Sequence, residues 1–255
     1  MRALFLLGLL VAGCALASEQ PLSFTLTGPA LDAGTREAFV STTPRFGRPE
    51  EFIRFDNRVG LNYGLGHRLE SQLLIAFFNT QEAVQGVSTG FGVQTRLRWQ
   101  PLDSRTDPVG LNLVATLGAA NDSLFFEGRL GAEARLGNFL FALNLSVDDS
   151  VQRADVPGPQ LHTEQTGGIA YRLPNNFTTG FEVRNRVGFD RGTYFGDAVF
   201  AGLVFGWKGK NGWFSLAALP QVAAIKAHSQ VGNGEALELR DNERVVLRLQ
   251  LGFDF

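Results

Sequence analysis

Charged residues alternate with apolar ones along much of the chain, and most of these charges are arginine guanidiniums or carboxylates. Because successive side chains of a β-strand point to opposite faces, residues two apart share a face. Arginine can hold a carboxylate with two hydrogen bonds, so an arginine-rich face would favour anions or carboxylated solutes. The candidate residues are Arg54, Asp56, Arg58, Arg68, Glu70, Arg96, Arg98, Glu127, Arg129, Glu133, Arg135, Glu164, Arg172, Glu182, Arg184, Arg186, Arg248 and Asp254.

The three histidines form no evident catalytic or metal-binding arrangement, since His67, His162 and His228 are widely separated. We expect His67 in a turn, His228 in a long loop, and His162 on the same strand face as Glu164. We therefore predict that the protein is not an enzyme and has no metal site and no cofactor.

The last residues of the chain show the alternation most clearly. Leu247, Leu249, Leu251, Phe253 and Phe255 share one face, and the residues between them are polar or glycine. A helix would mix these two sets, whereas a strand separates them. The pattern recurs in twelve segments, which are 35–43, 51–64, 67–79, 89–100, 108–119, 124–136, 138–149, 161–173, 176–188, 194–207, 211–222 and 244–255.

Composition narrows the class of protein. The 255 residues are 44% hydrophobic and 19% charged, with a formal net charge of −2, which argues against a nucleic-acid partner and against disorder. The single cysteine excludes an intramolecular disulfide framework and a four-cysteine zinc site. Ordinary globular domains contain about 20–25% strand. The much larger strand content predicted here indicates a closed barrel.

Loop lengths and apolar faces favour a barrel that spans a membrane. The Phe, Leu and Val faces carry almost no charge, so they suit lipid, while the charged faces would line the lumen. If both termini are periplasmic, short turns at Leu65-Gly66, Gly137, Pro174-Asn175 and Lys208-Gly209-Lys210 alternate with longer external loops, which include Thr80–Ser88, Ser150–Gln160 and Val222–Glu243. Only the periplasmic link Pro101–Asp107 is longer. We therefore predict an all-β, transmembrane, antiparallel up-and-down β-barrel of about twelve strands.

Aromatic residues gather at one end of the predicted strands. Amphipathic rings prefer the membrane–water interface, so this clustering indicates a girdle at the turn end. Its members are Tyr63, Trp99, Tyr171, Trp207 and Trp213.

The N-terminus reads as an export signal. Arg2 precedes an apolar stretch too short to span a bilayer, and Ala15-Leu16-Ala17 fits a small-x-small cleavage site. The sequence before Cys14 also fits a lipoprotein signal, so lipidation of Cys14 is the alternative to cleavage after Ala17. The domains are then a signal peptide at 1–17, a periplasmic segment or lumen plug at 18–34, and the barrel at 35–255.

The terminal strand resembles the C-terminal signature of Gram-negative outer-membrane β-barrel proteins. The alternating strand that ends in Leu251, Phe253 and Phe255 is the part of this chain that matches. The resemblance implies a bacterial outer-membrane location, with outer-membrane lipids and the barrel assembly machinery as partners. His-Arg-Leu-Glu, Pro-Asn-Asn-Phe and repeated aromatic–glycine pairs are further similar to small twelve-strand transporter or porin-type proteins of phenol-degradation pathways.

Three functions fit such a barrel. The first is a passive channel or transporter for small solutes through an arginine-rich polar lumen. The second is a closed structural barrel, filled by salt bridges, that binds a partner through external loops such as Val222–Glu243. The third is an outer-membrane lipid-modifying enzyme, because some twelve-strand outer-membrane barrels are phospholipases. Strand count does not decide among them, since twelve lies between filled eight-stranded and open 16–18-stranded barrels.

Overall fold

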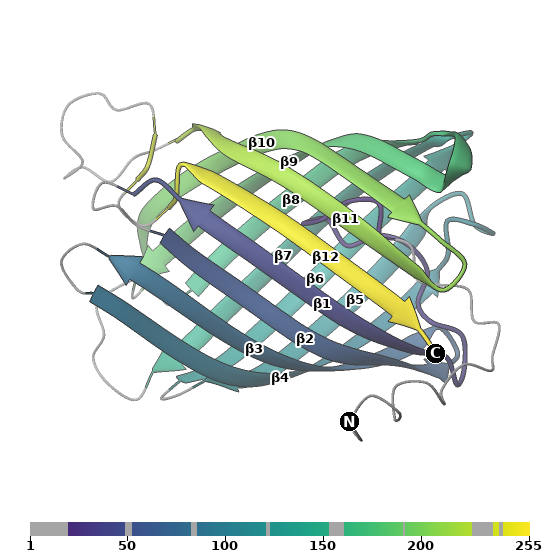
Figure 1. Cartoon of the computed structure of the whole chain (residues 1–255), viewed down its shortest axis with the longest axis horizontal. Coiled ribbons are helices and arrows are strands. Elements are labelled where there is room, and N and C mark those ends of the chain that lie inside the picture. The colour runs from purple at the N-terminus through teal and green to yellow at the C-terminus, as the bar shows by residue number, and fades with distance from the viewer. Residues whose placement is uncertain are drawn as a thin grey trace, which may run out of the picture.

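The computed structural model describes residues 20–48, 53–82, 86–120, 123–152, 161–190, 192–225, 237–239 and 242–255. Over these residues twelve antiparallel strands form a closed barrel, in which each strand pairs with its neighbours in sequence and β1 pairs with β12 (Figure 1). The strands are β1 (Arg36–Phe46), β2 (Ile53–Gly66), β3 (Leu69–Glu82), β4 (Gly86–Leu102), β5 (Gly110–Ala120), β6 (Ser123–Leu136), β7 (Phe139–Gln152), β8 (Leu161–Arg172), β9 (Phe177–Asp190), β10 (Thr193–Lys208), β11 (Gly212–Ala223) and β12 (Val245–Asp254).

The predicted fold class is confirmed, and each predicted segment corresponds to one strand. The predicted signal peptide at 1–17, which includes Cys14, lies outside the described residues. So does His228, which was predicted to lie in a loop. In the described part of the chain, no helix has the length and apolar character needed to cross a membrane.

The outer face of the barrel is apolar. Several large apolar side chains of this face are more than half exposed, as expected for a lipid-facing surface; they include Leu61, Phe91, Leu143 and Leu203. Polar residues between them turn inward, because a charge on the lipid face would cost about 2–4 kcal/mol at mid-bilayer for Arg or Lys. Along most of the wall, therefore, apolar side chains point outward and alternate with polar side chains that point inward.

The two ends of the barrel differ less in loop length than predicted. We call the end that holds the C-terminus the turn end, and the opposite end the loop end (Figure 1). At the turn end, β2 continues to Gly66, so the first turn is His67-Arg68 instead of Leu65-Gly66. Both turn residues have positive φ, 51° and 59°, as a two-residue hairpin turn with the strand's own twist requires.

At the loop end the strands run further than the sequence pattern suggested. β3 extends to Glu82 and β7 to Gln152, into the predicted loops Thr80–Ser88 and Ser150–Gln160. β5 ends at Ala120 and β6 begins at Ser123, so that link is as short as a turn. The expected alternation of short and long links is therefore only partly present.

Residues 20–34 lie inside the barrel near the turn end. Leu22 and Phe24 are buried against an apolar patch of the inner wall. This patch interrupts the polar lining, and the sequence analysis missed it. Its wall residues are Leu140, Ala170, Ala198, Phe200, Val204, Ala217, Leu219 and Val246.

Candidate functional site

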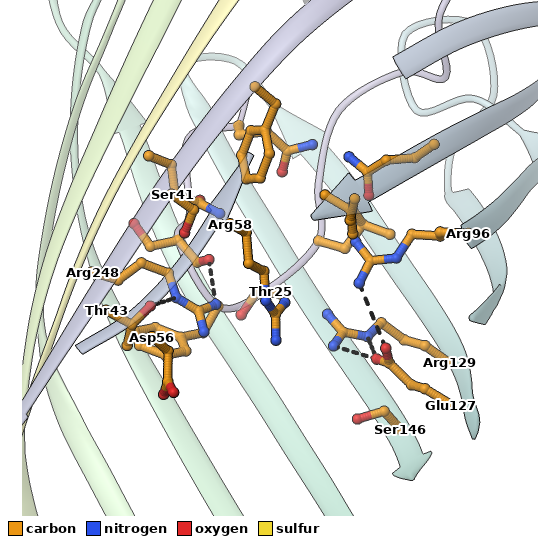
Figure 2. Close-up of a pocket in the computed structure, with 18 of the residues that line it drawn as sticks. Thr25, Ser41, Thr43, Asp56, Arg58, Arg96, Glu127, Arg129, Ser146 and Arg248 are labelled. Atoms are coloured by element: carbon orange, nitrogen blue, oxygen red, sulfur yellow. Dashed lines mark hydrogen bonds and ion pairs between the residues drawn. The ribbon is translucent and has the colours of Figure 1, made fainter. Parts of the chain in front are cut away.

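A cavity of about 230 Å³ lies in the lumen between the N-terminal segment and the inner wall (Figure 2). Its walls carry more positive than negative side chains, because eight arginines face six acidic residues. The arginines are Arg45, Arg58, Arg96, Arg98, Arg129, Arg184, Arg186 and Arg248, and the acids are Glu37, Asp56, Glu70, Glu127, Asp148 and Glu164.

Two of the cavity carboxylates are each held by two arginines. Asp56 lies 2.7 Å from both Arg45 and Arg54. Glu127 lies 2.6 Å from Arg129 and 3.5 Å from Arg96 (Figure 2). In each case one arginine lies two residues away on the same strand. The other comes from the neighbouring strand, as Arg45 does, or from the next-neighbouring one, as Arg96 does. The ion pairs neutralise part of the lumen, as the salt-bridge reading of the sequence expects.

Another carboxylate, Glu164 on β8, lies 2.6 Å from Arg184 on β9. This ion pair joins two neighbouring strands and neutralises a further part of the cavity charge.

Three arginines of the cavity make no ion pair with a described carboxylate. Arg58 and Arg186 enter none of the ion pairs or hydrogen bonds found among the described residues. Arg248 donates to the Thr43 hydroxyl at 3.2 Å and to the Ser23 carbonyl at 3.2 Å, and both acceptors are neutral. Among the residues that line the cavity, arginines therefore outnumber carboxylates, eight to six.

Carboxylates of the inner wall hold the N-terminal segment by its backbone. Glu182 accepts hydrogen bonds from the backbone N–H groups of Ser23, Phe24 and Thr25, at 3.2, 2.9 and 2.5 Å. Buried backbone donors need partners, and a carboxylate can serve several of them at once. The segment is therefore bound without forming a strand.

Further along the segment, single wall residues repeat this contact. Glu133 accepts from the Gly28 N–H at 2.8 Å, and Glu70 accepts from the Leu31 N–H at 3.0 Å. Gln100 accepts from Ala30 at 2.8 Å. The contacts come from β3, β4, β6 and β9, so the segment is tied to widely separated parts of the wall.

Phe24 is the side chain that joins the segment to the cavity arginines. The Arg248 guanidinium lies 3.8 Å from the centre of its ring, and that of Arg184 lies 5.1 Å from it. A cation over an aromatic face is attracted by the ring quadrupole. The segment thus covers part of the positive wall with an apolar ring.

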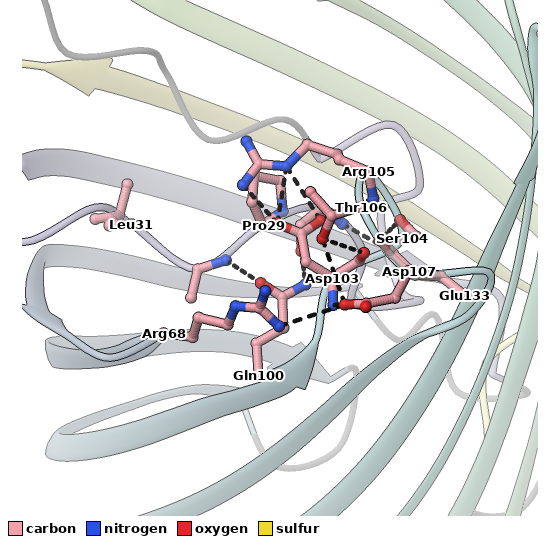
Figure 3. A network of polar contacts seen from close by, with 12 residues as sticks. Pro29, Leu31, Arg68, Gln100, Asp103, Ser104, Arg105, Thr106, Asp107 and Glu133 are labelled. Carbon is pink, nitrogen blue, oxygen red and sulfur yellow. Dashed lines mark hydrogen bonds and ion pairs between the residues drawn. The ribbon is translucent and has the colours of Figure 1, made fainter.

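The link between β4 and β5 supports the segment from the turn end (Figure 3). Asp103 accepts from the Arg105 guanidinium at 2.6 Å and from the Arg105 backbone at 2.9 Å. Burial acts to raise the pKa of Asp103, but these bonds from Arg105 hold it below its usual value. Ser104 donates to Glu133, which in turn accepts from Gly28. The ordered link therefore positions a carboxylate that binds the segment.

The structure places the sequence-predicted residues in three groups. The first lines the cavity, and it comprises Asp56, Arg58, Glu70, Arg96, Arg98, Glu127, Arg129, Glu164, Arg184, Arg186 and Arg248. The second group, Glu133 and Glu182, is buried under the N-terminal segment.

The members of the third group do not line the cavity. Arg54 stacks over Phe78, 4.9 Å from the ring centre, and Arg135 donates to Ser104 at 3.2 Å. Arg68 and Arg172 are exposed at the turn end, so their expected place in the lumen was wrong. Arg68 is a turn residue because β2 ends two residues later than expected, at Gly66, and β3 begins at Leu69.

One member of the expected aromatic girdle points the other way. Tyr63, Trp99, Tyr171 and Trp207 are exposed on the outer face. Trp213 is only 4% exposed, lines the cavity, and donates through Nε1 to Glu37 at 2.7 Å. Its assignment to the girdle was wrong.

The neighbouring strand makes room for this tryptophan. Trp213 pairs with Gly252, and a Cβ on that glycine would lie 2.2 Å from Trp213 Nε1. Ser215 and Gln221 share the inward face with Trp213. Trp213 is separated from these two polar residues by an even number of positions. That spacing is the sequence signal that could have placed its side chain inside the barrel.

Glu37, Arg45 and Asp148 are cavity residues that the sequence analysis missed. Arg45 was missed because β1 continues past the predicted end at residue 43. Glu37 lies on β1 at an even spacing from Arg45, and Asp148 lies opposite Glu127. Because residues an even number of positions apart on a strand share a face, this spacing alone would have placed these charged side chains inside the barrel.

No group of His, Cys, Asp and Glu side chains suited to a metal ion occurs within the described ranges. His162 Nδ1 lies 3.2 Å from Asp148 at the loop side of the lumen. The proposed assembly residues lie on β12 and after it, with Phe253 exposed on the outer face.

Comparison with known proteins agrees with this geometry. A family model described as a family of unknown function, DUF6662, matches residues 14–255. The structure is similar to the COG4313 outer membrane channel from Pseudomonas putida F1, with a TM-score of 0.66 and 13% identity over 89% of this chain and 97% of that one. It is also similar to the NanC porin, with a TM-score of 0.57 and 10% identity over 86% of this chain and 100% of that one.

A third solved structure is the KdgM porin in complex with disordered oligogalacturonate, with a TM-score of 0.52 and 10% identity over 85% of this chain and 99% of that one. No curated protein matches the chain. At these identities the likeness shows the fold, which is that of outer-membrane β-barrels.

Proposed function

The chain belongs to the DUF6662 family, and we propose that it is an outer-membrane channel through which small anionic solutes pass. The observation that carries this proposal is the excess of arginine over carboxylate around the cavity. A lumen of one sign raises the local concentration of solutes of the opposite sign. The similar solved structures include a channel and porins, which supports a conducting barrel.

The proposed location is the bacterial outer membrane, with both chain ends on the periplasmic side. The apolar outer wall fits a lipid environment, and the outward aromatic residues at the turn end fit its interface. Leu251, Phe253 and Phe255 would be read by the barrel assembly machinery during insertion. Residues 20–34 then narrow the periplasmic mouth of the lumen.

Ion selectivity in a planar bilayer tests the channel. We expect stable current steps from the refolded protein and a reversal potential that shows anion preference in a salt gradient. Arg58→Gln and Arg248→Gln each remove a cavity charge that has no carboxylate partner, so each should lower the anion-to-cation permeability ratio. Arg68→Gln is the matched control, since Arg68 lies outside the cavity, and it should leave the ratio unchanged.

Preference for cations would contradict the proposed charge of the lumen. A folded barrel without current would favour the second candidate, a closed barrel that acts through its loops. The paired charges at Asp56 and Glu127, and the segment bound in the lumen, are the observations behind that candidate. In that case a lipid-hydrolysis assay on the same protein would test the third candidate function, an outer-membrane lipid-modifying enzyme.

A further inference from the structure

We infer that the lumen contains a discrete binding site for a small oxyanion, either a carboxylate or a phosphate, formed by Arg58 and Arg248. This inference rests on the proposed function and deepens it, because a diffuse positive field attracts anions without holding them. A site requires donors that converge on one place and whose charge is not neutralised by a carboxylate of the protein.

The fold brings the two guanidiniums together from either side of β1. Arg58 is on β2 and Arg248 is on β12, and these are the two neighbours of β1. Arg58 pairs with Ser41, while Arg248 donates to Thr43 on the same inward face of β1. Figure 2 shows Arg58, Arg248 and both hydroxyl residues at one side of the cavity.

Neither arginine lies within ion-pair distance of a carboxylate among the described residues. Asp56, the acid nearest in register, is held at 2.7 Å by both Arg45 and Arg54. Glu164 is held by Arg184 at 2.6 Å. Two arginines that repel each other inside a barrel would be stabilised by an anion between them, since electrostatic interactions strengthen where water is scarce.

The N-terminal segment completes the site. Thr25 and Arg58 both line the cavity (Figure 2), and the Ser23 carbonyl accepts from Arg248 at 3.2 Å. The cavity of about 230 Å³ is smaller than the roughly 300–1,000 Å³ of pockets for drug-sized ligands. The site therefore suits an acid of a few carbon atoms or a phosphate.

Isothermal titration calorimetry on the refolded full barrel tests this site. The probes are succinate, inorganic phosphate and the uncharged 1,4-butanediol. We expect saturable binding of at least one anion and none of the diol, and the preferred anion identifies the source. Because hydrogen bonds to charged groups are strong, Arg58→Gln and Arg248→Gln should each weaken binding about tenfold or more. Arg58→Lys should retain part of the affinity, and Arg68→Gln all of it.

The two proposals fail in different ways. Anion-selective current without saturable binding, or equal affinity in Arg58→Gln and the unchanged protein, would overturn the site and leave the channel. Saturable binding without current would support the site and overturn the channel. Heat-modifiable electrophoretic mobility of every variant shows that the barrel is folded before binding is compared.

Discussion

Glu182 illustrates how one residue organises the lumen. Its side chain is fully buried and accepts three backbone N–H groups from the N-terminal segment. A buried carboxylate is costly unless it is paired or hydrogen-bonded, and here the segment provides the donors. The carboxylate and the segment therefore stabilise each other's burial.

Loss of the Glu182 charge should loosen the segment. Glu182→Gln leaves one carbonyl oxygen for three donors, so we expect the barrel to lose about 1–3 kcal/mol of stability from the unsatisfied groups. Glu70→Gln should cost less, because Glu70 accepts only from Leu31 within the segment. Urea unfolding of the refolded barrel in lipid measures both. Equal losses in the two variants would contradict this account.

Trp213 offers a direct probe of lumen charge. The chain has three tryptophans, so a Trp99→Phe, Trp207→Phe variant retains only the buried one beside Glu37. We expect iodide to quench its fluorescence more than caesium, because the cavity carries net positive charge. A variant that retains only Trp99, on the lipid face, should respond weakly to both ions. Stronger quenching by caesium in the first variant would contradict an anion-attracting lumen.

At the scale of the element, the end of β2 receives the N-terminal segment. Gly64 donates to the Thr35 carbonyl at 3.0 Å and accepts from the Gly34 N–H at 2.8 Å. A Cβ at Gly64 would lie 1.9 Å from the Asp32 carbonyl oxygen. The absence of a side chain there is what allows the segment to pack against the strand.

Substitution of Gly64 should therefore displace the segment without disturbing the strands. In Gly64→Ala, we expect faster proteolysis of residues 20–34 and larger current steps. Gly128→Ala is the control, since a Cβ there meets nothing within 4 Å. Circular dichroism checks that both variants keep their strand content. If Gly64→Ala matched the control in both assays, the segment would not depend on this contact.

At the scale of the whole molecule, closure of the sheet creates an interior with two different sides. The apolar patch around Phe200 holds Leu22 and Phe24, and the charged side leaves the cavity open beside them. Strand pairing of β1 with β12 removes the exposed edges that an open sheet would have. The segment narrows this interior and is not needed to close the sheet.

Removal of residues 20–33 should therefore leave the barrel folded and widen the path through it. We expect a larger single-channel conductance than in the full chain, with anion preference retained because Arg58 and Arg186 remain in the wall. Planar-bilayer recording measures both quantities. A conductance equal to that of the full chain would show that the segment does not limit passage.

Alternation along the chain determined the strands, their number and their two faces. A period of two is a local property, so residues such as Leu249 and Arg248 reveal their faces without knowledge of any partner. The same alternation also places Trp213 inside the barrel, since it shares a face with polar residues of β11. It places Arg45 inside as well, once β1 is extended past residue 43.

Only the tertiary structure decided which charges neutralise one another and which remain. Arg248 and Thr43 are 205 residues apart in sequence, and they meet because β12 closes against β1. Likewise, Glu182 meets Phe24 only because the segment folds back into the lumen. Strand periodicity specifies a face but not the register between distant strands or the path of a segment across the interior. The cavity and its carboxylate-free arginines are consequences of that closure.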